Sequence, residues 1–492
     1  MLKSNVAWST NKDSYTQGKE SAQKAVVDLI QTKVAFLYTS VDCNIEKVLE
    51  GAKSELGTAP IIGCTSSGGI ITPGGFITSE NGFTGIMGIG DPNMAVGVAG
   101  APRGEDPRAT ARKVAKEAMA KVGTDKAPSY YYMVASPGEE EQYVKGIADV
   151  IGEIPFSGGS AADNTVEGKW KIFTNDQIFS DGVAVAFFYT NTPIENEFTG
   201  AYHETTNSGI ITKLKGKRTL VEIDGVPAIK KYAEWTGKKE KDLMGSNLLS
   251  ATITEPLGVK DRLGDLIAIR HPMFGNEDGS MNIGNDMAVN TAIQMQGSVD
   301  ELIQGAAKTA KKLQKRLPGK AGAYLFIHCG GRKLAIGDRI GEVSDAIKKV
   351  VGDTPFIMAF TFGEYGDTDH SGNTCGGLML SDTAFCEWRD GEKPQNEEAK
   401  YECTITKYKD GEVMVCKNIN SSKREEATMK NLIGYEWKEA SNGAKIEVVN
   451  PATQELIETV PNVTEEDVDE AVKVAVQEQK KWEKVSIYER AE

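Results

Sequence analysis

The stretch Pro355–Leu380, PFIMAFTFGEYGDTDHSGNTCGGLML, carries the pattern from which the fold of this chain can be worked out. It begins with an apolar run of β-type residues, Phe356–Phe362, and ends with a second apolar run, Gly377–Leu380. A polar loop rich in Gly, Asp, Ser and Asn lies between them and contains Glu364 and Asn373. The pattern predicts a strand, a loop and a second strand. Polar groups held on a loop by two buried strands are typical of a small-ligand site, and the alternative is a solvated hairpin loop.

Outward from this stretch, helical spacing of apolar residues alternates with short β-type runs. The expected helices are residues 13–31, 45–56, 107–122, 139–151, 299–313 and 342–351, with strands at 34–39, 129–135 and 323–328 among others. Helix, strand, helix, strand, glycine-rich loop and strand occur twice in this order, and the pattern returns before Pro355. We therefore expect an α+β (mixed α/β) fold: a layered sandwich of mixed, largely antiparallel sheets, with helices outside, built from repeated β-α-β-loop-β units.

Two glycine-rich loops follow expected strands and offer backbone N–H groups and hydroxyls to an anion. The first is GCTSSGG, Gly63–Gly69, and the second is SGGSAADN, Ser157–Asn164. Successive N–H groups beside glycines can form an anion-binding nest, although these glycines could equally serve only tight turns. The first loop lacks the lysine of a P-loop, so a nucleotide triphosphate site is not expected. The candidate ligand-binding residues here are Cys64, Thr65, Ser66, Gly159, Ser160 and Asp163.

Two arginines and one acid complete the candidate site. Arg270 ends an apolar strand, and Arg332 follows Cys329-Gly330-Gly331 at another strand end. An arginine at a strand end is well suited to hold a carboxylate, and the alternative is an ordinary surface ion pair. Glu364 directly follows an apolar run and could accept an ammonium group or an arginine, or could be solvated. These residues predict an amino acid or a small carboxylate as the ligand.

The composition excludes several classes of partner and cofactor. The net charge of −14 over 492 residues argues against nucleic acid and anionic membrane as partners. The N-terminal residues contain no apolar signal segment, and the seven cysteines are scattered without a CxxC pair, so we expect a cytoplasmic protein without a disulfide framework. The four histidines lie far apart at no familiar ligand spacing. We therefore expect neither a metal nor any other cofactor.

Two cysteines offer an enzymatic alternative. Cys64 and Cys329 each follow an expected buried strand, where a nucleophile could lie. His328 is adjacent to Cys329, but neighbouring side chains on a strand point to opposite faces, so His328 cannot easily act as its base. A cysteine-dependent hydrolase stays open as an alternative.

Six motifs in order resemble the FIST sensory domain family, over roughly residues 13–385. They are GCTSSGG, PFSGGSAADN, EIDGVPAIKKYAEWTG (Glu222–Gly237), HCGGR, the helix carrying Glu342, and FGEYGDTDHSGNT. The resemblance implies a non-catalytic intracellular sensor of signal transduction that binds small molecules such as amino acids. The family-like positions are Cys64, Ser66, Gly159, Ser160, Asp163, Arg332, Glu364 and Asn373. One departure is that Ser371 and Gly372 separate His370 from Asn373, so either of the two could meet a ligand.

The C-terminal tail resembles the first segment of an aldehyde dehydrogenase. The resemblance rests on NPAT at Asn450–Thr453, the VP before TEEDVDEAV, and the ending that contains Trp482. Thr464 should cap a helix whose apolar face includes Val468 and Val472. The family's catalytic cysteine and its NAD-binding glycines are absent, so we expect no dehydrogenase activity from the chain itself. A protein partner for the tail follows as a hypothesis.

The expected organisation has five parts. They are residues 1–12 as an N-terminal arm, 13–200 as the FIST N-terminal domain, 201–386 as the FIST C-terminal domain, 387–430 as a linker with a small hairpin, and 431–492 as the aldehyde-dehydrogenase-like fragment. The leading hypothesis is a small-ligand sensor. The alternatives are an enzyme, either a hydrolase or part of a split aldehyde dehydrogenase, and a scaffold that recruits a dehydrogenase subunit through its tail.

Overall fold

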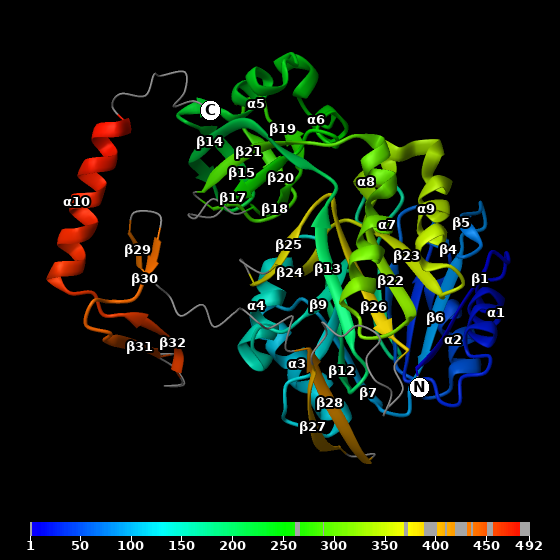
Figure 1. Ribbon diagram of the computed structural model, residues 1–492. Helices are drawn as coiled ribbons and strands as arrows, with labels where there is room; N and C mark the ends of the chain where they lie inside the picture. The colour runs from blue at the N-terminus through cyan, green and yellow to red at the C-terminus, as the bar shows by residue number, and fades with distance from the viewer. Residues whose placement is uncertain are drawn as a thin grey trace. The chain divides into compact units, whose positions relative to one another are not determined.

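The computed structural model describes residues 2–260, 266–288, 290–368, 372–387, 401–408, 411–418, 431–433, 436–449 and 456–482. The chain forms two compact units, Met1–Asn418 and Ile419–Glu492 (Figure 1).

Three six-stranded sheets of the first unit share one strand order. The first contains β1 (Lys3–Ser9), β6 (Thr84–Gly90), β2 (Val34–Thr39), β3 (Ile61–Thr65), β10 (Ile172–Thr174) and β11 (Ile178–Phe179). The second contains β7 (Met94–Pro102), β12 (Gly182–Thr190), β8 (Tyr130–Ala135), β9 (Phe156–Ser160), β24 (Glu364–Thr368) and β25 (Gly372–Gly376). The third contains β13 (Ile194–Gly200), β26 (Met379–Cys386), β22 (Ala321–Cys329), β23 (Phe356–Thr361), β4 (Ile70–Thr72) and β5 (Gly75–Ile77). In each sheet the third and fourth strands are parallel and the other neighbours are antiparallel, so the expected repeat and the mixed, largely antiparallel sheets are confirmed.

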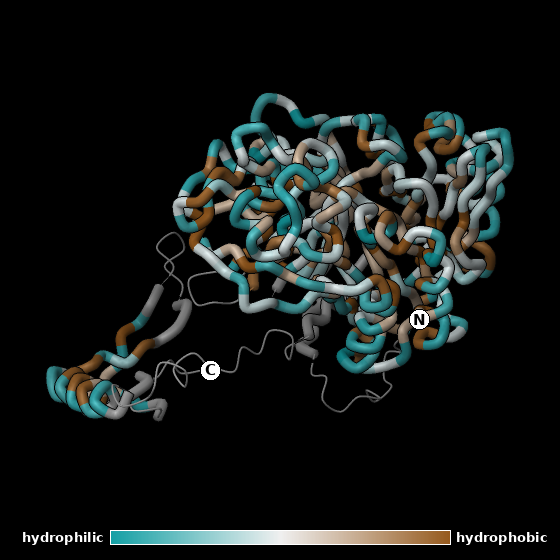
Figure 2. Tube along the Cα trace, turned by 90° about the horizontal axis from the view of Figure 1, so that it is seen from above, coloured by the Kyte–Doolittle hydropathy of each residue, from teal (hydrophilic) through white to brown (hydrophobic). Residues whose placement is uncertain are grey.

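Helices cover the outer face of each sheet. The pairs are α1 (Ser14–Ala25) with α2 (Ile45–Leu56), α3 (Pro107–Val122) with α4 (Glu140–Ile151), and α7 (Val299–Arg316) with α9 (Gly341–Val351). The inner faces of the three sheets enclose a common apolar core, in which Phe36 lies 5.1 Å from Tyr132 and 6.4 Å from Phe385 between ring centroids. Hydrophilic and hydrophobic residues alternate along the helices (Figure 2). Burial of this periodic apolar face holds each helix on its sheet.

Five of the six expected helices begin and end within about three residues of the prediction, because their apolar period and caps are strong. The helix expected over residues 13–31 is the exception. The Asp13 carboxylate caps its first turn by accepting the Thr16 N–H, but the helix ends at Ala25. Asp28 has a left-handed φ of 59°, which a continuing α-helix does not allow.

The polar loop expected after Phe362 is a correction to the sequence prediction. It is not one loop, because β24 and β25 form a hairpin within it, and that hairpin pairs with β9 of the second sheet. In the same way β4–β5, which follow β3, pair with β23 of the third sheet. The hairpin β10–β11, which follows β9, pairs with β3 of the first sheet. Each repeat therefore gives its hairpin to another repeat, and the three exchanges form a closed cycle.

A fourth, antiparallel sheet lies between the second and third repeats in sequence. It contains β14 (His203–Lys215), β15 (Thr219–Ile223), β16 (Val226–Pro227), β17 (Leu257–Lys260), β18 (Leu266–Arg270), β19 (Pro272–Gly275), β20 (Met281–Ile283) and β21 (Thr291–Gln296). Three short helices accompany this sheet: α5 (Ala228–Thr236), η1 (Glu240–Leu243) and α6 (Asn247–Ala251).

Several sheet pairings cross the expected domain boundaries. Lys3–Ser9, within the expected arm, forms the edge strand β1. β13, which ends at Gly200, pairs with β26 from the expected second domain. A hairpin of β27 (Tyr401–Tyr408) and β28 (Gly411–Asn418) lies within the expected linker, and its turn residues 409 and 410 are outside the described residues.

The described residues of the second unit form two short β-hairpins and one long helix. The hairpins are β29 (Asn431–Ile433) with β30 (Glu436–Lys438), and β31 (Lys445–Val449) with β32 (Leu456–Pro461), followed by α10 (Glu465–Trp482). The expected cap is confirmed, because the Thr464 hydroxyl accepts the Asp467 N–H and the Asp467 carboxylate accepts the Thr464 N–H.

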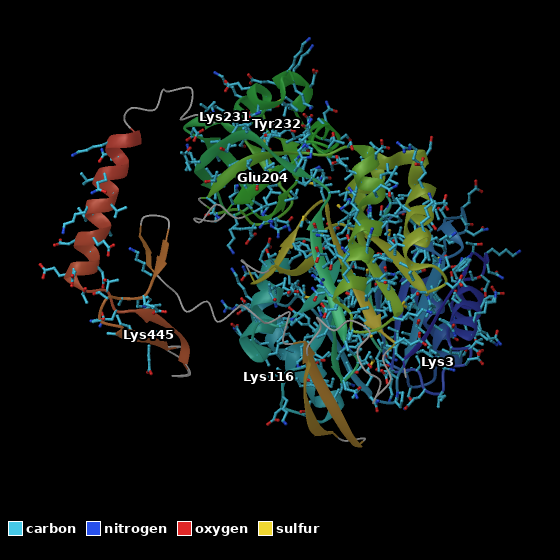
Figure 3. All side chains as sticks on the ribbon, viewed as in Figure 1. Lys3, Lys116, Glu204, Lys231, Tyr232 and Lys445 are labelled. Carbon is cyan, nitrogen blue, oxygen red and sulfur yellow. The ribbon has the colours of Figure 1, made fainter. Side chains whose placement is uncertain are left out.

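Charged side chains such as Lys116, Lys231 and Lys445 extend from the outer surface of their own units (Figure 3). Among the helices of the described residues, none combines the length and apolar character needed to cross a membrane.

Candidate functional site

The glycine-rich loops that the sequence selects meet at the ends of β3, β9 and β23. The Thr65 carbonyl accepts the Ala162 N–H at 3.0 Å, which joins the first loop to the second. The Ser66 hydroxyl accepts the Phe360 N–H at 2.8 Å, which joins the first loop to the third. Ser160 closes the circle, because its N–H donates to the Gly363 carbonyl at 2.7 Å. The three loops therefore meet through hydrogen bonds that they make with each other's main chain.

Most of the loop residues act on the protein's own backbone. The Asp163 carboxylate accepts four N–H groups from the following turn, between Thr165 and Lys169. The Thr65 hydroxyl accepts the Lys171 N–H at 2.9 Å. A Cβ at Gly63 would lie 1.8 Å from the Leu37 carbonyl oxygen, so only glycine allows the two strands to approach this closely. The loops therefore make the turns by which the chain passes from one sheet to the next.

Arg332 and Glu364 do come together, in a buried polar cluster beneath α7. Arg332 lies on α8 (Gly330–Ile336), not on a loop after the strand, and both side chains are fully buried. Glu364 accepts the Thr361 hydroxyl and the Met379 N–H, each at 2.9 Å. Burial still dominates and raises the pKa of Glu364 to about 8, with the Arg332 charge acting in the opposite direction. At neutral pH Glu364 is therefore mostly uncharged.

Arg332 is incompletely satisfied in this cluster. Its Nη2 donates to the Leu302 carbonyl at 3.2 Å, while Nε and Nη1 have no hydrogen-bond partner among the described residues. Asp382 faces it from β26, fully buried, with neither carboxylate oxygen in a hydrogen bond of normal geometry to a described residue. Burial raises the pKa of Asp382 well above its usual range, although Arg332 opposes the rise. The guanidinium is thus a buried cation beside two acids that favour their neutral forms.

Arg270 and Asn373 have ordinary structural contacts. The Arg270 guanidinium donates to the carbonyls of Cys375 at 2.9 Å and Asp286 at 3.0 Å. The Asn373 amide donates to the Tyr131 hydroxyl at 3.3 Å. His370 and Ser371 lie outside the described residues, so the choice between His370 and Asn373 as a ligand contact stays a prediction.

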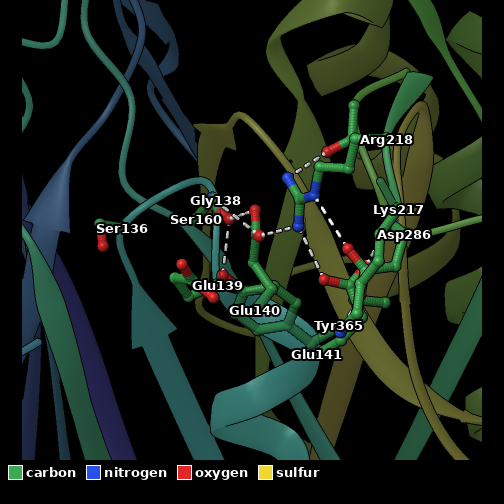
Figure 4. Close-up of polar contacts among 12 residues, drawn as sticks. Ser136, Gly138, Glu139, Glu140, Glu141, Ser160, Lys217, Arg218, Asp286 and Tyr365 are labelled. Atoms are coloured by element: carbon green, nitrogen blue, oxygen red, sulfur yellow. Dashed lines mark hydrogen bonds and ion pairs between the residues drawn. The ribbon is translucent and has the colours of Figure 1, made fainter. Parts of the chain in front are cut away.

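Ser160 belongs to a second polar network, between α4 and the fourth sheet (Figure 4). Its hydroxyl lies 2.6 Å from the Tyr365 hydroxyl and donates to Glu140 at 3.1 Å. Arg218 donates from Nη2 to both Glu140 and Glu141, each at 2.7 Å, and from Nη1 to the Gly284 carbonyl at 2.8 Å. Every nitrogen of Arg218 is engaged, because its Nε also bonds the Asp286 carboxylate at 3.1 Å. This network joins two parts of the first unit, and each nitrogen of Arg218 already has an acceptor in it.

The two candidate nucleophiles lie in apolar surroundings. Burial raises the pKa of Cys64 to about 12, and burial together with the Glu364 carboxyl raises the pKa of Cys329 to about 12. Both groups are therefore thiols at neutral pH, whereas cysteine nucleophiles react as thiolates. The described residues contain no group of three His, Cys, Asp or Glu side chains placed to hold a metal ion.

Sequence reasoning found Arg332 and Glu364 and missed their neighbours Asp382 and Tyr202. Asp382 had a visible signal, since it stands within the apolar strand MLSDTAFC, where an acid needs a reason to be buried. Tyr202 had none, because it lies in the short turn between β13 and β14 and reaches the cluster only in the folded protein.

Comparison with known proteins identifies the class. The FIST N domain model matches residues 33–226 and the FIST C domain model matches residues 228–367, so the chain belongs to the FIST-domain proteins. FIST domains are sensory domains of signal transduction. The aldehyde dehydrogenase family model matches residues 437–492.

The curated relatives match only the tail. The chain is 45% identical over 64 residues to malonate-semialdehyde dehydrogenase 2 of Bacillus mycoides, covering 13% of each protein. It is 41% identical over 73 residues to malonate-semialdehyde dehydrogenase 1 of Geobacillus kaustophilus, covering 15% of each. The chain thus spans about an eighth of the length of these relatives.

Among solved structures, PurLQS of Thermotoga maritima aligns with 82% of this chain and 74% of its own, at 9% identity and a TM-score of 0.21. That score is too low for any conclusion about this chain.

Glu364 should make the stability of the protein depend on pH. In the unfolded chain its carboxyl ionises near the ordinary value of 4.5, and in the folded protein near 8. Between these values the folded state binds the extra proton, so stability falls as pH rises, by up to about 1.4 kcal/mol per pH unit. Denaturant unfolding from pH 5 to 8 should show a steeper fall for the wild type than for Glu364→Gln. Equal slopes would mean that Glu364 is already ionised in the folded protein.

Proposed function

We propose that the FIST region is a non-catalytic receptor for an amino acid or a small carboxylate. One observation supports this most directly: Arg332 is fully buried while Nε and Nη1 have no acceptor among the described residues. A buried guanidinium without acceptors is destabilising, and a bound carboxylate would supply both the counter-charge and the missing hydrogen bonds. Glu364 and Asp382 favour their neutral forms, so neither replaces an anion fully.

A panel of free amino acids and small carboxylates tests this proposal. An acid that binds the native state should raise Tm, with a stabilisation of about 2.7 kcal/mol at a hundredfold excess over Kd. Arg332→Met should remove that rise, because methionine fills a similar volume without charge. The matched control is Arg339→Met, since Arg339 is exposed and pairs with Asp300 and Glu342 at the surface. If no acid alters the melting of the wild type, the proposal fails.

The cysteine-hydrolase alternative makes a different prediction. Because Cys64 and Cys329 are buried thiols with raised pKa values, a thiol reagent at pH 7.5 should modify both far more slowly than a free thiol. Peptide mapping by mass spectrometry after timed labelling measures each site separately. Rapid modification of either residue in the native protein would revive the hydrolase hypothesis.

A second function concerns the tail, for which we propose docking to an aldehyde-dehydrogenase-type subunit. On α10 the side chains of Val468, Val472 and Val476 are 50%, 56% and 45% exposed. They follow each other at helical spacing, so one apolar stripe is uncovered within its unit. The sequence match to the aldehyde dehydrogenase family is the reason to choose this class of partner over others. Part of a split aldehyde dehydrogenase is the enzymatic form of the same hypothesis.

Size-exclusion chromatography with the malonate-semialdehyde dehydrogenase of Bacillus subtilis, one of the proteins that the tail resembles, tests the docking. The two proteins should elute together, and Val472→Asp should abolish the complex because it places a charge on the stripe. Lys473→Asp, on the neighbouring exposed position, is the control and should leave the complex intact. Separate elution of the wild-type chain would contradict the docking proposal.

A further inference from the structure

A small pocket opens directly above the Arg332 cluster. It has a volume of about 230 Å³ and lies between the turn of residues 199–203 and one face of α7. That volume suits a small metabolite, since pockets for drug-sized ligands measure about 300–1,000 Å³. The same stripe of α7 that lines the pocket, Gly305 and Thr309, is the stripe that packs on the buried cluster. The same two residues of α7 therefore border both the pocket and the buried cluster.

Gly305 is the thinnest part of the floor. A Cβ at this position would lie 2.5 Å from Arg332 Nη2 and 3.1 Å from the Leu380 side chain. The guanidinium therefore lies immediately beneath the pocket, and the lack of a side chain at Gly305 is what allows it to lie there. One turn further along α7, the Thr309 hydroxyl donates to the Gly305 carbonyl at 2.9 Å, on the side that faces Asp382.

Tyr202 connects the pocket with the cluster. The residue lines the pocket, and its buried hydroxyl has no hydrogen-bond partner among the described residues. The charges that act on this hydroxyl are those of Arg332, Cys329 and Glu364, so its tip lies inside the cluster. One end of Tyr202 thus lies at the pocket wall, and its unpaired hydroxyl lies beside Arg332. Rotation about its side-chain bonds would therefore let a ligand pass.

The pocket rim is suited to an anion. Lys308 and Lys312 stand on α7 at the mouth, and Lys308 makes no ion pair with any residue that the structure describes. Lys312 pairs with Glu197 at 2.8 Å. The one acid of the rim, Glu301, accepts the Ser298 N–H and hydroxyl in the capping box of α7 and lies 4.0 Å from His203. Two lysines and one carboxylate therefore surround the mouth, above a buried arginine with two unbonded nitrogens, and this excess of positive charge attracts an anion.

We propose that this pocket is the entrance and binding site for a small carboxylate anion, which passes Tyr202 and pairs with Arg332. The inference rests on the proposed receptor function and adds to it the site, the route and the charge class of the ligand. It predicts that the charged carboxylate group itself, and not the shape of the molecule, decides binding. It also makes α7 the element that a bound ligand contacts, through Gly305 and Thr309.

Acetate and acetamide form the simplest matched pair of probes, because they share shape and differ in charge. Calorimetric titration and thermal shift of the full chain, with ionic strength matched by sodium chloride, should show binding of acetate and not of acetamide. Gly305→Ala should weaken acetate binding by about tenfold, since the new methyl group displaces Arg332 Nη2. Lys308→Glu should weaken it by about threefold at low salt and less at high salt.

Two control variants match these changes. Gly341→Ala adds a methyl group at the start of α9, where nothing lies within 4 Å, and Lys311→Glu reverses an exposed charge on α7 outside the pocket. Both should bind acetate as the wild type does. If Arg332→Met loses a carboxylate-induced Tm shift that Gly305→Ala and Lys308→Glu both retain, the receptor function stands and this entrance is wrong. If the wild type responds to no carboxylate, the receptor function fails and the entrance fails with it.

Discussion

The fold depends on one constraint: at the ends of β3, β9 and β23 the chain leaves its own sheet and completes another. The three crossings are held at the shared centre by three hydrogen bonds, which join Ala162 to Thr65, Phe360 to Ser66, and Ser160 to Gly363. Because every outgoing hairpin supplies strands to a neighbouring repeat, no sheet has all six of its strands until the others have formed. Buried main-chain N–H and C=O groups need hydrogen-bond partners. This explains why small residues and residues with hydroxyl groups gather at these turns.

The same constraint gives a physical reason for the glycine-rich motifs that look like anion-binding loops. The N–H groups of Ser67, Ser160 and Ala162 donate to carbonyls of another repeat, so they are already bonded. Polar groups without hydrogen-bond partners lie elsewhere. The third repeat buries Arg332 beneath α7, beside two acids that favour their neutral forms. Motif residues and open polar groups are therefore largely different residues, although Arg332 and His328 of the HCGGR motif each have a buried nitrogen without a hydrogen-bond partner among the described residues.

Arg218, which is partly exposed, and Arg332, which is fully buried, show how differently the same side chain can be used. Arg218 finds acceptors for each nitrogen in Glu140, Glu141, Asp286 and the Gly284 carbonyl, so it stabilises the contact between α4 and the fourth sheet. Arg332 has one acceptor, the Leu302 carbonyl, and lies under a pocket floored by glycine. Satisfied charge stabilises structure, whereas unsatisfied buried charge stores free energy that a ligand can recover.

Local sequence was sufficient for five of the six expected helices and for the strands expected at 34–39, 129–135 and 323–328, because apolar periodicity and helix caps act within a few residues. It also selected Arg332 and Glu364 among the candidate site residues, by their positions after apolar runs. It did not reveal that the polar loop after Phe362 is a hairpin donated to another sheet, since strand partners are chosen by contacts far along the chain. Only the tertiary structure placed Tyr202, Gly305 and Asp382 around Arg332, because burial and charge pairing arise between elements and leave no local pattern.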